Sequence, residues 1–157
     1  MASSTPALKF WNKLNGSAIG RWLFAKIICF KAPYFGSISP RISVLQHNRC
    51  EGFFNHKRKV QNHIGTVHAI ALCNIAELCA GLMVDVSLPS DMRWIPQSMT
   101  VNYLKKAKGK MHAKAEPIDP LISNNDSYPA KTKVTISDSS GIEVFTAEIN
   151  MWISPRK

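Results

Sequence analysis

The segment from Thr66 to Val86 constrains the fold most strongly, because its pattern predicts a helix that is apolar on two faces. One apolar stripe at helical spacing comprises Val67, Ala71, Ile75, Leu78, Leu82 and Val86. A second face carries only small side chains, at Ala69, Cys73, Ala76 and Ala80. Small residues let a sheet approach the helix axis closely, and a helix that is apolar on two faces must be covered on both. We therefore expect this helix at the centre of the domain.

Strand patterns follow the helix from Met92 onward. Residues 110–116 and 130–137 alternate apolar and polar side chains, as does the last run from Phe145 to Ile153. Turn and loop residues separate these runs, at Pro89, at Pro96, in Pro120–Pro129 and in Ser137–Gly141. One buried helix followed by about four antiparallel strands predicts an α+β domain whose sheet curls around the helix.

The N-terminal region has a different pattern, and we assign residues 1–33 to a helical extension and 34–157 to the main domain. Residues 7–30 predict a basic amphipathic helix, which Gly16 and Gly20 weaken enough to divide it into two pieces. Such a segment is compatible with contact at a membrane surface. We favour packing against the rest of the domain. Short strand-like runs follow around Ile38 and from Ile42 to Cys50.

The charge is unevenly distributed, and it indicates an anionic partner. The 157 residues carry a net charge of +10, and Lys105, Lys106, Lys108, Lys110 and Lys114 form a cluster without acids. This positive charge would attract a nucleic acid, an anionic membrane or a phosphorylated small molecule. A solvated surface that only aids solubility matches it as well.

The number and spacing of the cysteines indicate a reducing cellular compartment. The four cysteines form no CxxC pair, and their density is low for a disulfide-stapled domain. Reduced thiols and a cytoplasmic location are the expectation, with one ordinary domain of this length.

Polar residues gather immediately before the central helix. A helix N-terminus presents unpaired N–H groups and a partial positive charge, which stabilise an anion or a developing oxyanion. Gly65 permits a close approach there, and Thr66 is a candidate N-cap. Asn62, His63 and His68 add polar groups beside the same helix start.

Glu77 is an acid in the middle of this apolar helix, where a carboxylate needs either a partner or a chemical task. His68 precedes it by nine residues, which places the two on opposite sides of the helix and about 13.5 Å apart along it. They cannot share a site within one chain. Two copies packed antiparallel about a two-fold axis would bring the helix start of one to the acid of the other. This spacing predicts a homodimer, or a dimer of dimers.

These residues resemble the hotdog-fold acyl-CoA thioesterases, particularly the phenylacetate-pathway type and a branch with an extra N-terminal helix. In that family an Asn, a Gly and then His-Gly-Gly open the central helix, and an Asp or Glu follows the His by nine residues. Asn62, Gly65, His68 and Glu77 match this frame over a domain of roughly residues 34–154. The departure is Ala69-Ile70, which stands where the family has Gly-Gly.

The resemblance implies a hotdog fold, with a curved antiparallel sheet around one long helix, and thioester hydrolysis. By the same resemblance, Glu77 is the general base or nucleophile and the N–H of Ala69 polarises the thioester carbonyl. Asn62 and His68 position substrate or water, beside Gly65, His63 and Thr66. Lys105, Lys106 and Lys108 are expected to meet the phosphates of coenzyme A, which enters as part of the substrate. No metal and no separate cofactor are implied.

Alternative functions remain open at this point. The main alternative is a non-catalytic hotdog module that holds an acyl-CoA or a fatty acyl group, which the Ala69-Ile70 departure favours. Nucleic-acid binding is supported by net charge alone. A zinc site at His63 and His68 lacks a recognised ligand spacing. The chain also lacks the G-x-S-x-G of serine hydrolases and a phosphate-binding glycine loop.

Overall fold

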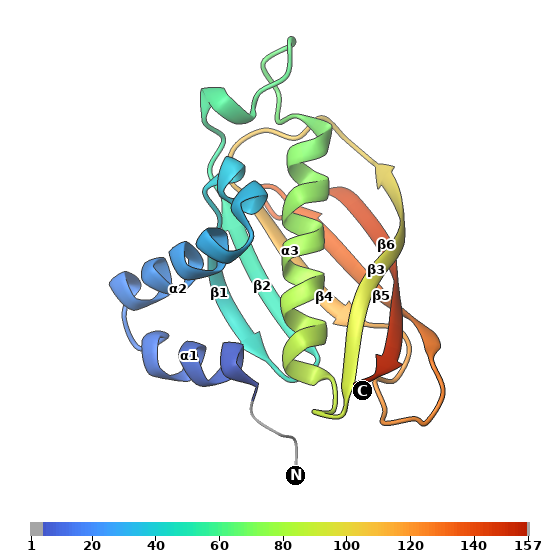
Figure 1. Ribbon diagram of the computed structural model, residues 1–157. Coiled ribbons are helices and arrows are strands. Elements are labelled where there is room, and N and C mark those ends of the chain that lie inside the picture. The colour runs from blue at the N-terminus through green and yellow to red at the C-terminus, as the bar shows by residue number, and fades with distance from the viewer. Residues whose placement is uncertain (1–4, 157) are drawn as a thin grey trace.

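The computed structural model describes residues 5–156, and its centre is a long helix in the curve of a six-stranded sheet (Figure 1). The helices are α1 (Pro6–Leu14), α2 (Ala18–Lys31) and α3 (Ala69–Ser87), with short 3-10 helices η1 (Pro33–Ile38) and η2 (Arg58–Val60). The strands are β1 (Arg41–Gln46), β2 (Arg49–Phe54), β3 (Met92–Tyr103), β4 (Met111–Pro117), β5 (Tyr128–Ser137) and β6 (Glu143–Pro155).

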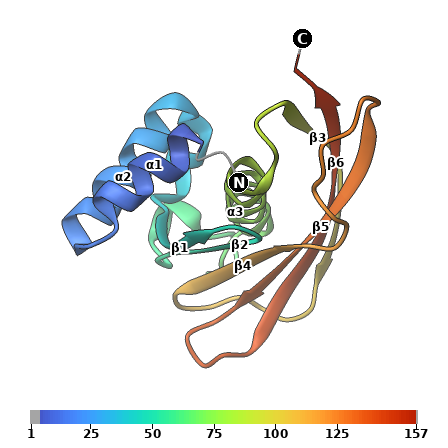
Figure 2. The same cartoon turned by 90° about the horizontal axis from the view of Figure 1, so that it is seen from below.

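Every strand pair in the sheet is antiparallel, in the order β1-β2-β4-β5-β6-β3. Strand β3 therefore forms one edge of the sheet and β1 forms the other. The sheet curls beneath α3, with the two N-terminal helices beside β1 and the pair β3 and β6 on the opposite side (Figure 2). This is the predicted α+β architecture, and the predicted wrapping of the sheet around the central helix is confirmed.

Helix α3 is the core of the domain, as its two apolar faces predict. The side chains of Ile75, Ala76, Cys79 and Ala80 are fully buried. By length and apolar composition α3 is the single helix within residues 5–156 that would suffice to cross a membrane, but 72% of that window is buried inside the fold. Its apolar character is thus accounted for by the sheet that surrounds it.

The structure corrects four local predictions. The central helix begins at Ala69, and its N-cap is His68 rather than Thr66, because the His68 Nδ1 accepts a hydrogen bond from the Ile70 N–H at 3.1 Å. Ile38 belongs to η1 and not to a strand. The run from Ile42 to Cys50 is a hairpin, since Asn48 adopts a φ of 61° and reverses the chain between β1 and β2. Pro96 lies inside β3, at a register shift opposite β6.

The N-terminal extension consists of two helices, as the weakening at Gly16 and Gly20 predicts. Gly20 is required by close packing, because a β-carbon there would lie 1.9 Å from the carbonyl oxygen of Leu14. Trp11 and Phe24, both buried, join α1 to α2 through an edge-to-face contact with ring centroids 5.1 Å apart. Helix α1 contacts α3 and β1, and α2 contacts β1. The prediction that the extension packs against the domain is confirmed.

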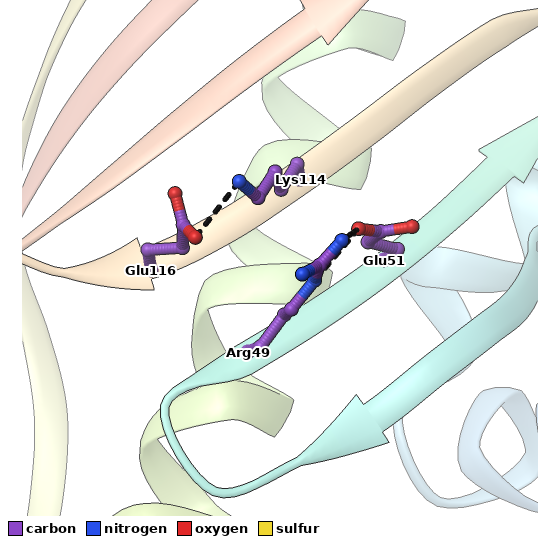
Figure 3. Close-up of polar contacts among 4 residues, drawn as sticks. All are labelled: Arg49, Glu51, Lys114 and Glu116. Atoms are coloured by element: carbon purple, nitrogen blue, oxygen red, sulfur yellow. Dashed lines mark hydrogen bonds and ion pairs between the residues drawn. The ribbon is translucent and has the colours of Figure 1, made fainter.

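The convex face of the sheet carries charged side chains. On β2 and β4, Arg49 pairs with Glu51, and Lys114 pairs with Glu116 at 2.8 Å (Figure 3). Figure 3 shows these four side chains on the side of the strands that faces away from α3. Exposed ion pairs of this kind contribute little stability. Helix α3 lies on the other, concave side of the sheet (Figure 2).

Candidate active site

The face of α3 toward the N-terminal helices carries two acids and a glycine at intervals of four residues. Glu77, Gly81 and Asp85 lie on one face because four residues make slightly more than one helical turn. Both acids are half-buried. Gly81 is constrained by Trp94 of β3, whose Cη2 would lie 2.8 Å from a β-carbon at that position. The missing side chain lets the indole lie directly against the helix between the two acids.

A cavity of about 620 Å³ lies over this face, between the N-terminal helices and α3. Glu77 and Asp85 both line it, together with Trp94. The rest of its wall is largely apolar and comes from α1, α2, η1 and α3: Ala7, Phe10, Phe24, Ile27, Ile28, Phe35, Leu78 and Leu82. The volume is within the range of small-molecule sites in proteins.

Asp85 is held in a less polar setting than an ordinary surface acid. Burial raises the pKa of its carboxyl above the usual value, while hydrogen bonding from Trp94 and the charge of Arg156 partly oppose that effect. Its carboxylate charge is therefore less favourable than that of an exposed aspartate. The acid marks the end of the cavity next to Trp94 and the C-terminus.

Two smaller cavities continue from Glu77 toward the start of α3. One of about 270 Å³ is lined by Tyr34, Ile70, Cys73, Asn74 and Glu77, with Ala32, Pro33 and Phe35. The next, of about 370 Å³, shares Tyr34, Ile70 and Asn74 and reaches His68. The three cavities together follow the Glu77 face of α3 from Asp85 to His68, and Glu77 lies where the largest meets the next.

Asn74 presents an unsatisfied acceptor among these cavities. Its side chain is 6% exposed, and its Nδ2 donates to the carbonyl oxygen of Tyr34 at 3.3 Å and to the Ser37 hydroxyl at 3.1 Å. The carbonyl of Tyr34 can only accept, which fixes the orientation of the amide. The buried Oδ1 has no hydrogen-bond partner. A buried acceptor without a partner is costly, so a ligand that donates to this oxygen would be stabilised.

Cys73 and Tyr103 meet beside Glu77, across the gap between α3 and β3. The Cys73 Sγ lies 3.3 Å from the Tyr103 hydroxyl, and this hydrogen bond raises the pKa of Tyr103 to about 12, with burial adding to the effect. Tyr103 is thus a neutral hydroxyl under ordinary conditions. Its hydroxyl contacts Cys73, which lines the same small cavity as Glu77.

The polar residues before α3 form a closed turn. Asn62 Oδ1 accepts from the N–H groups of Ile64 at 3.2 Å and Thr66 at 3.0 Å, and its Nδ2 donates to the Thr66 hydroxyl at 2.7 Å. Gly65 has a φ of 75°, a left-handed conformation that favours glycine in this turn. Thr66 is 4% exposed. In this structure Asn62 and Thr66 therefore stabilise the turn that leads into α3, whereas His63 is exposed.

His68 and Glu77 lie in different cavities, as their spacing predicts. His68 is exposed at the N-cap, and Ala69 is the first helical residue, whose N–H lacks an intrahelical acceptor. Ile70 is 51% exposed beside them and lines both smaller cavities. One chain thus holds the N–H of Ala69 at a helix start and, separately, an acid at an apolar cavity.

Part of the predicted lysine cluster lies close to this helix start, whereas Lys114 lies on β4 and pairs with Glu116. Lys105, Lys106 and Lys108 are exposed in the loop between β3 and β4. Ala107 in the same loop is buried, and its carbonyl accepts from the N–H of Val67 at 2.9 Å. That bond holds the basic loop against the segment that leads into α3.

Several residues of this site were not predicted from the sequence. Gly81 and Asp85 continue the spacing from Glu77 at i+4 and i+8, and this spacing is the signal that was available. Asn74 is a buried polar residue one turn before Glu77, and its position offered a similar signal. Trp94 had none, because its contact with Gly81 joins two distant segments. Within residues 5–156, no group of three or more His, Cys, Asp or Glu side chains is arranged to hold a metal ion.

Comparison with known proteins relates this architecture to one family and one fold. Residues 20–153 match the family described as "Domain of unknown function (DUF4442)". A solved structural-genomics protein, APC5556, is 38% identical, with a TM-score of 0.82 over 96% of this chain and 98% of that one. No curated protein matches the chain in sequence at a significant level.

Two more distant structures carry informative names. A Pseudomonas aeruginosa protein of unknown function, PA5026, termed a probable thioesterase, is 21% identical, with a TM-score of 0.76 and coverage of 99% and 100% of the two chains. Thioesterase HI1161 from Haemophilus influenzae is 15% identical, with a TM-score of 0.71 and coverage of 82% and 87%. These likenesses show the fold: the chain has the hotdog architecture of thioesterase-family proteins, as the resemblance implied.

Proposed function

Since the chain belongs to the DUF4442 family and has the hotdog fold, we propose that it is an acyl-CoA thioesterase. The observation that carries this proposal is Glu77, a half-buried acid at the junction of a large apolar cavity with a smaller one. An apolar cavity suits an acyl group, and a carboxylate at its mouth suits attack on the carbonyl at the head of that group.

In the proposed reaction, Glu77 takes a proton from a water molecule, and the oxygen of that water attacks the thioester carbonyl carbon. The oxyanion that forms needs hydrogen-bond donors, and the N–H of Ala69 at a helix start is suited to that task. Collapse of the intermediate breaks the carbon–sulfur bond and releases a carboxylic acid and the thiol of coenzyme A. Direct attack by the Glu77 carboxylate, followed by hydrolysis of the resulting anhydride, is the other route.

The reaction requires two copies of the chain, because Glu77 and Ala69 of one chain lie in different places on α3. The open edge of β3 supports a two-fold arrangement, because β3 of a second copy could pair with it. The N–H of Leu104, just after β3, donates to Val144 at 2.9 Å, so alternation directs the amides of Tyr103, Val101 and Met99 away from β6. No charged residue lies between Arg93 and Lys105 to discourage pairing with a second copy of the same strand.

Coenzyme A carries phosphates, and we assign their binding to the loop with Lys105, Lys106 and Lys108. Reversal of Lys105 and Lys106 to glutamate should raise KM for an acyl-CoA by at least about tenfold, because charge-assisted hydrogen bonds to phosphate would be lost. The KM for the corresponding acyl-pantetheine, which lacks the nucleotide, should change by less than about twofold. Steady-state kinetics with both substrates measures this difference.

The matched control reverses Lys9 and Lys13, which are exposed on α1 and change the net charge by the same amount. It should leave both KM values unchanged. An equal rise in KM for the two substrates in the Lys105 and Lys106 variant would show that the loop does not bind the nucleotide.

The direct test is a screen of thiol release from acetyl-, octanoyl-, palmitoyl- and phenylacetyl-CoA by the purified protein. Turnover of any of these substrates above the rate without protein supports the proposal. If the protein releases no thiol but binds an acyl-CoA in calorimetry, the second candidate holds instead.

That second candidate is a non-catalytic hotdog module that retains an acyl-CoA or fatty acyl group. One observation favours it: Ile70, half-exposed at the helix start, puts a bulky side chain where thioesterases of the resembling type have glycine. Ile70→Gly then distinguishes the two functions. A rise in thiol release would show that Ile70 obstructs the approach of the thioester.

A further inference from the structure

We propose that the two N-terminal helices form the far wall of an acyl-chain chamber, which takes an unbranched fatty acyl group of about eight to ten carbons. The carbonyl end of the chain would lie at Glu77 and its methyl end at Asp85 and Trp94. The inference rests on the proposed function for the identity of the head group. It adds the class of acyl group and a role for α1 and α2.

The wall of the 620 Å³ cavity carries the first part of the argument. The apolar side chains that the extension supplies include Ala7, Phe10, Phe24, Ile27 and Ile28, and α3 supplies Leu78 and Leu82. Within this lining Phe24 is almost fully buried, whereas Phe10 remains 51% exposed. Ile27 lines the cavity without joining the buried core cluster. Apolar side chains left open toward a cavity are stabilised when an apolar ligand covers them.

The length of the chamber limits the length of the chain. Glu77 and Asp85 are eight residues apart on one helix, which at 1.5 Å per residue gives about 12 Å. An extended hydrocarbon chain advances about 1.25 Å per carbon, so the interval matches about eight to ten carbons. At Gly81 the Trp94 indole lies directly against the helix, so a chain that spans this interval would pass along the indole.

The distribution of polar groups sets the direction of the chain. The lining that Glu77 and Asp85 share is largely apolar, and the half-buried Asp85 carboxyl and the Arg156 guanidinium would limit how far an apolar chain extends. On the other side of Glu77, the smaller cavities offer the unpartnered Oδ1 of Asn74, an acceptor suited to an amide N–H of a pantetheine arm. The apolar portion of an acyl-CoA therefore fits toward Asp85, and its amide-bearing portion fits toward Asn74.

The test measures binding rather than turnover, with S-alkyl-CoA thioethers that cannot be hydrolysed. Calorimetry of the full chain with ethyl, butyl, hexyl, octyl, decyl and tetradecyl thioethers should show tighter binding by about threefold to fourfold per added methylene, from the transfer of each group out of water. The gain should stop at about ten carbons. Affinity that does not depend on chain length, or that rises steadily to tetradecyl, would overturn the chamber.

A matched pair of variants locates the chain. Ile27→Trp places a bulky ring in the cavity and should weaken binding of the decyl thioether by at least about tenfold, while binding of the ethyl thioether stays within about twofold. Ile19→Trp makes the same change on the same helix at a position that is 78% exposed and outside the cavity lining, and should alter neither affinity. Equal weakening of both thioethers by Ile27→Trp would show that the chain binds elsewhere.

A second variant tests the chamber independently, in case Ile27→Trp does not fold. Phe10→Ala removes a half-exposed ring from the chamber wall and should weaken binding of the decyl thioether by at least about threefold without affecting the ethyl thioether. Unchanged decyl affinity in this variant would count against the chamber.

Hydrolysis and binding are separable in this design. Chain-length dependence without thiol release would reject the thioesterase and retain the chamber. Thiol release without chain-length dependence would reject the chamber and retain the thioesterase.

Discussion

Replacement of Glu77 by glutamine should lower kcat for the best acyl-CoA substrate by at least about 10²-fold, the usual scale for a lost acid–base group. Glutamine keeps the shape of the side chain, but it can neither accept the proton of a water molecule nor attack as a carboxylate. KM should change much less, because the cavity walls remain in place. Steady-state kinetics of the purified variant, with melting temperature and sedimentation as checks of folding and assembly, measures the effect.

The matched control for Glu77→Gln is Glu148→Gln. Glu148 is an exposed acid on β6 that pairs with Lys131 at 2.8 Å, far from the cavities along α3. This substitution also removes one carboxylate from the chain and should leave kcat unchanged. A Glu77→Gln enzyme that works at the wild-type rate would contradict the proposed mechanism and leave Glu77 with a structural role.

Replacement of Val101 by proline should convert the protein to a monomer at micromolar concentration and reduce its thioesterase activity by at least about 10²-fold. Proline removes the N–H that points away from β6 and places a ring at the open edge of β3, so a second copy of β3 cannot pair there. The backbone hydrogen bonds from β3 to β6 are retained, because in an antiparallel pair every second residue makes them, here Thr100 and Asn102 rather than Val101. Analytical ultracentrifugation and kinetics follow the two effects together.

Val101→Ala is the control, because it shortens the same side chain while the N–H remains. Val101 packs against the core, so alanine should lower the melting temperature without separating the copies. A proline variant that remains a dimer would show that the chains associate through another surface. A wild-type protein that is monomeric and active would overturn the shared site altogether.

Much of the fold was predictable because its signals are local in sequence. The two apolar faces of the segment from Thr66 to Val86 predict a wrapped helix, and α3 is wrapped. The alternation in residues 110–116 and 130–137 corresponds to β4 and β5. The acid Glu77 also stood out locally, as a carboxylate in an apolar helix. Each of these signals depends on side-chain period or on the cost of burying a charge, and both can be evaluated from neighbouring residues.

The errors at element boundaries have a different origin. The run from Ile42 to Cys50 lacks a glycine or proline turn signal, yet Asn48 adopts a positive φ and the chain reverses there. The Ser87 hydroxyl accepts from the Asn48 N–H at 2.7 Å, from the far end of α3. A contact across 39 residues of chain thus supports a turn that the local pattern did not indicate.

Local residue patterns identify which helix is buried and which residues alternate in strands, and the spacing of His68 and Glu77 keeps them apart within one chain. The packing of distant segments places α1 and α2 across a cavity from α3 and Trp94 against Gly81, and it brings Asp85 and the Oδ1 of Asn74 into the same row of cavities as Glu77. Periodicity reports which side of an element avoids water, whereas a cavity is space that several distant elements leave unfilled. Its shape depends on how those elements pack, and no single segment carries that information.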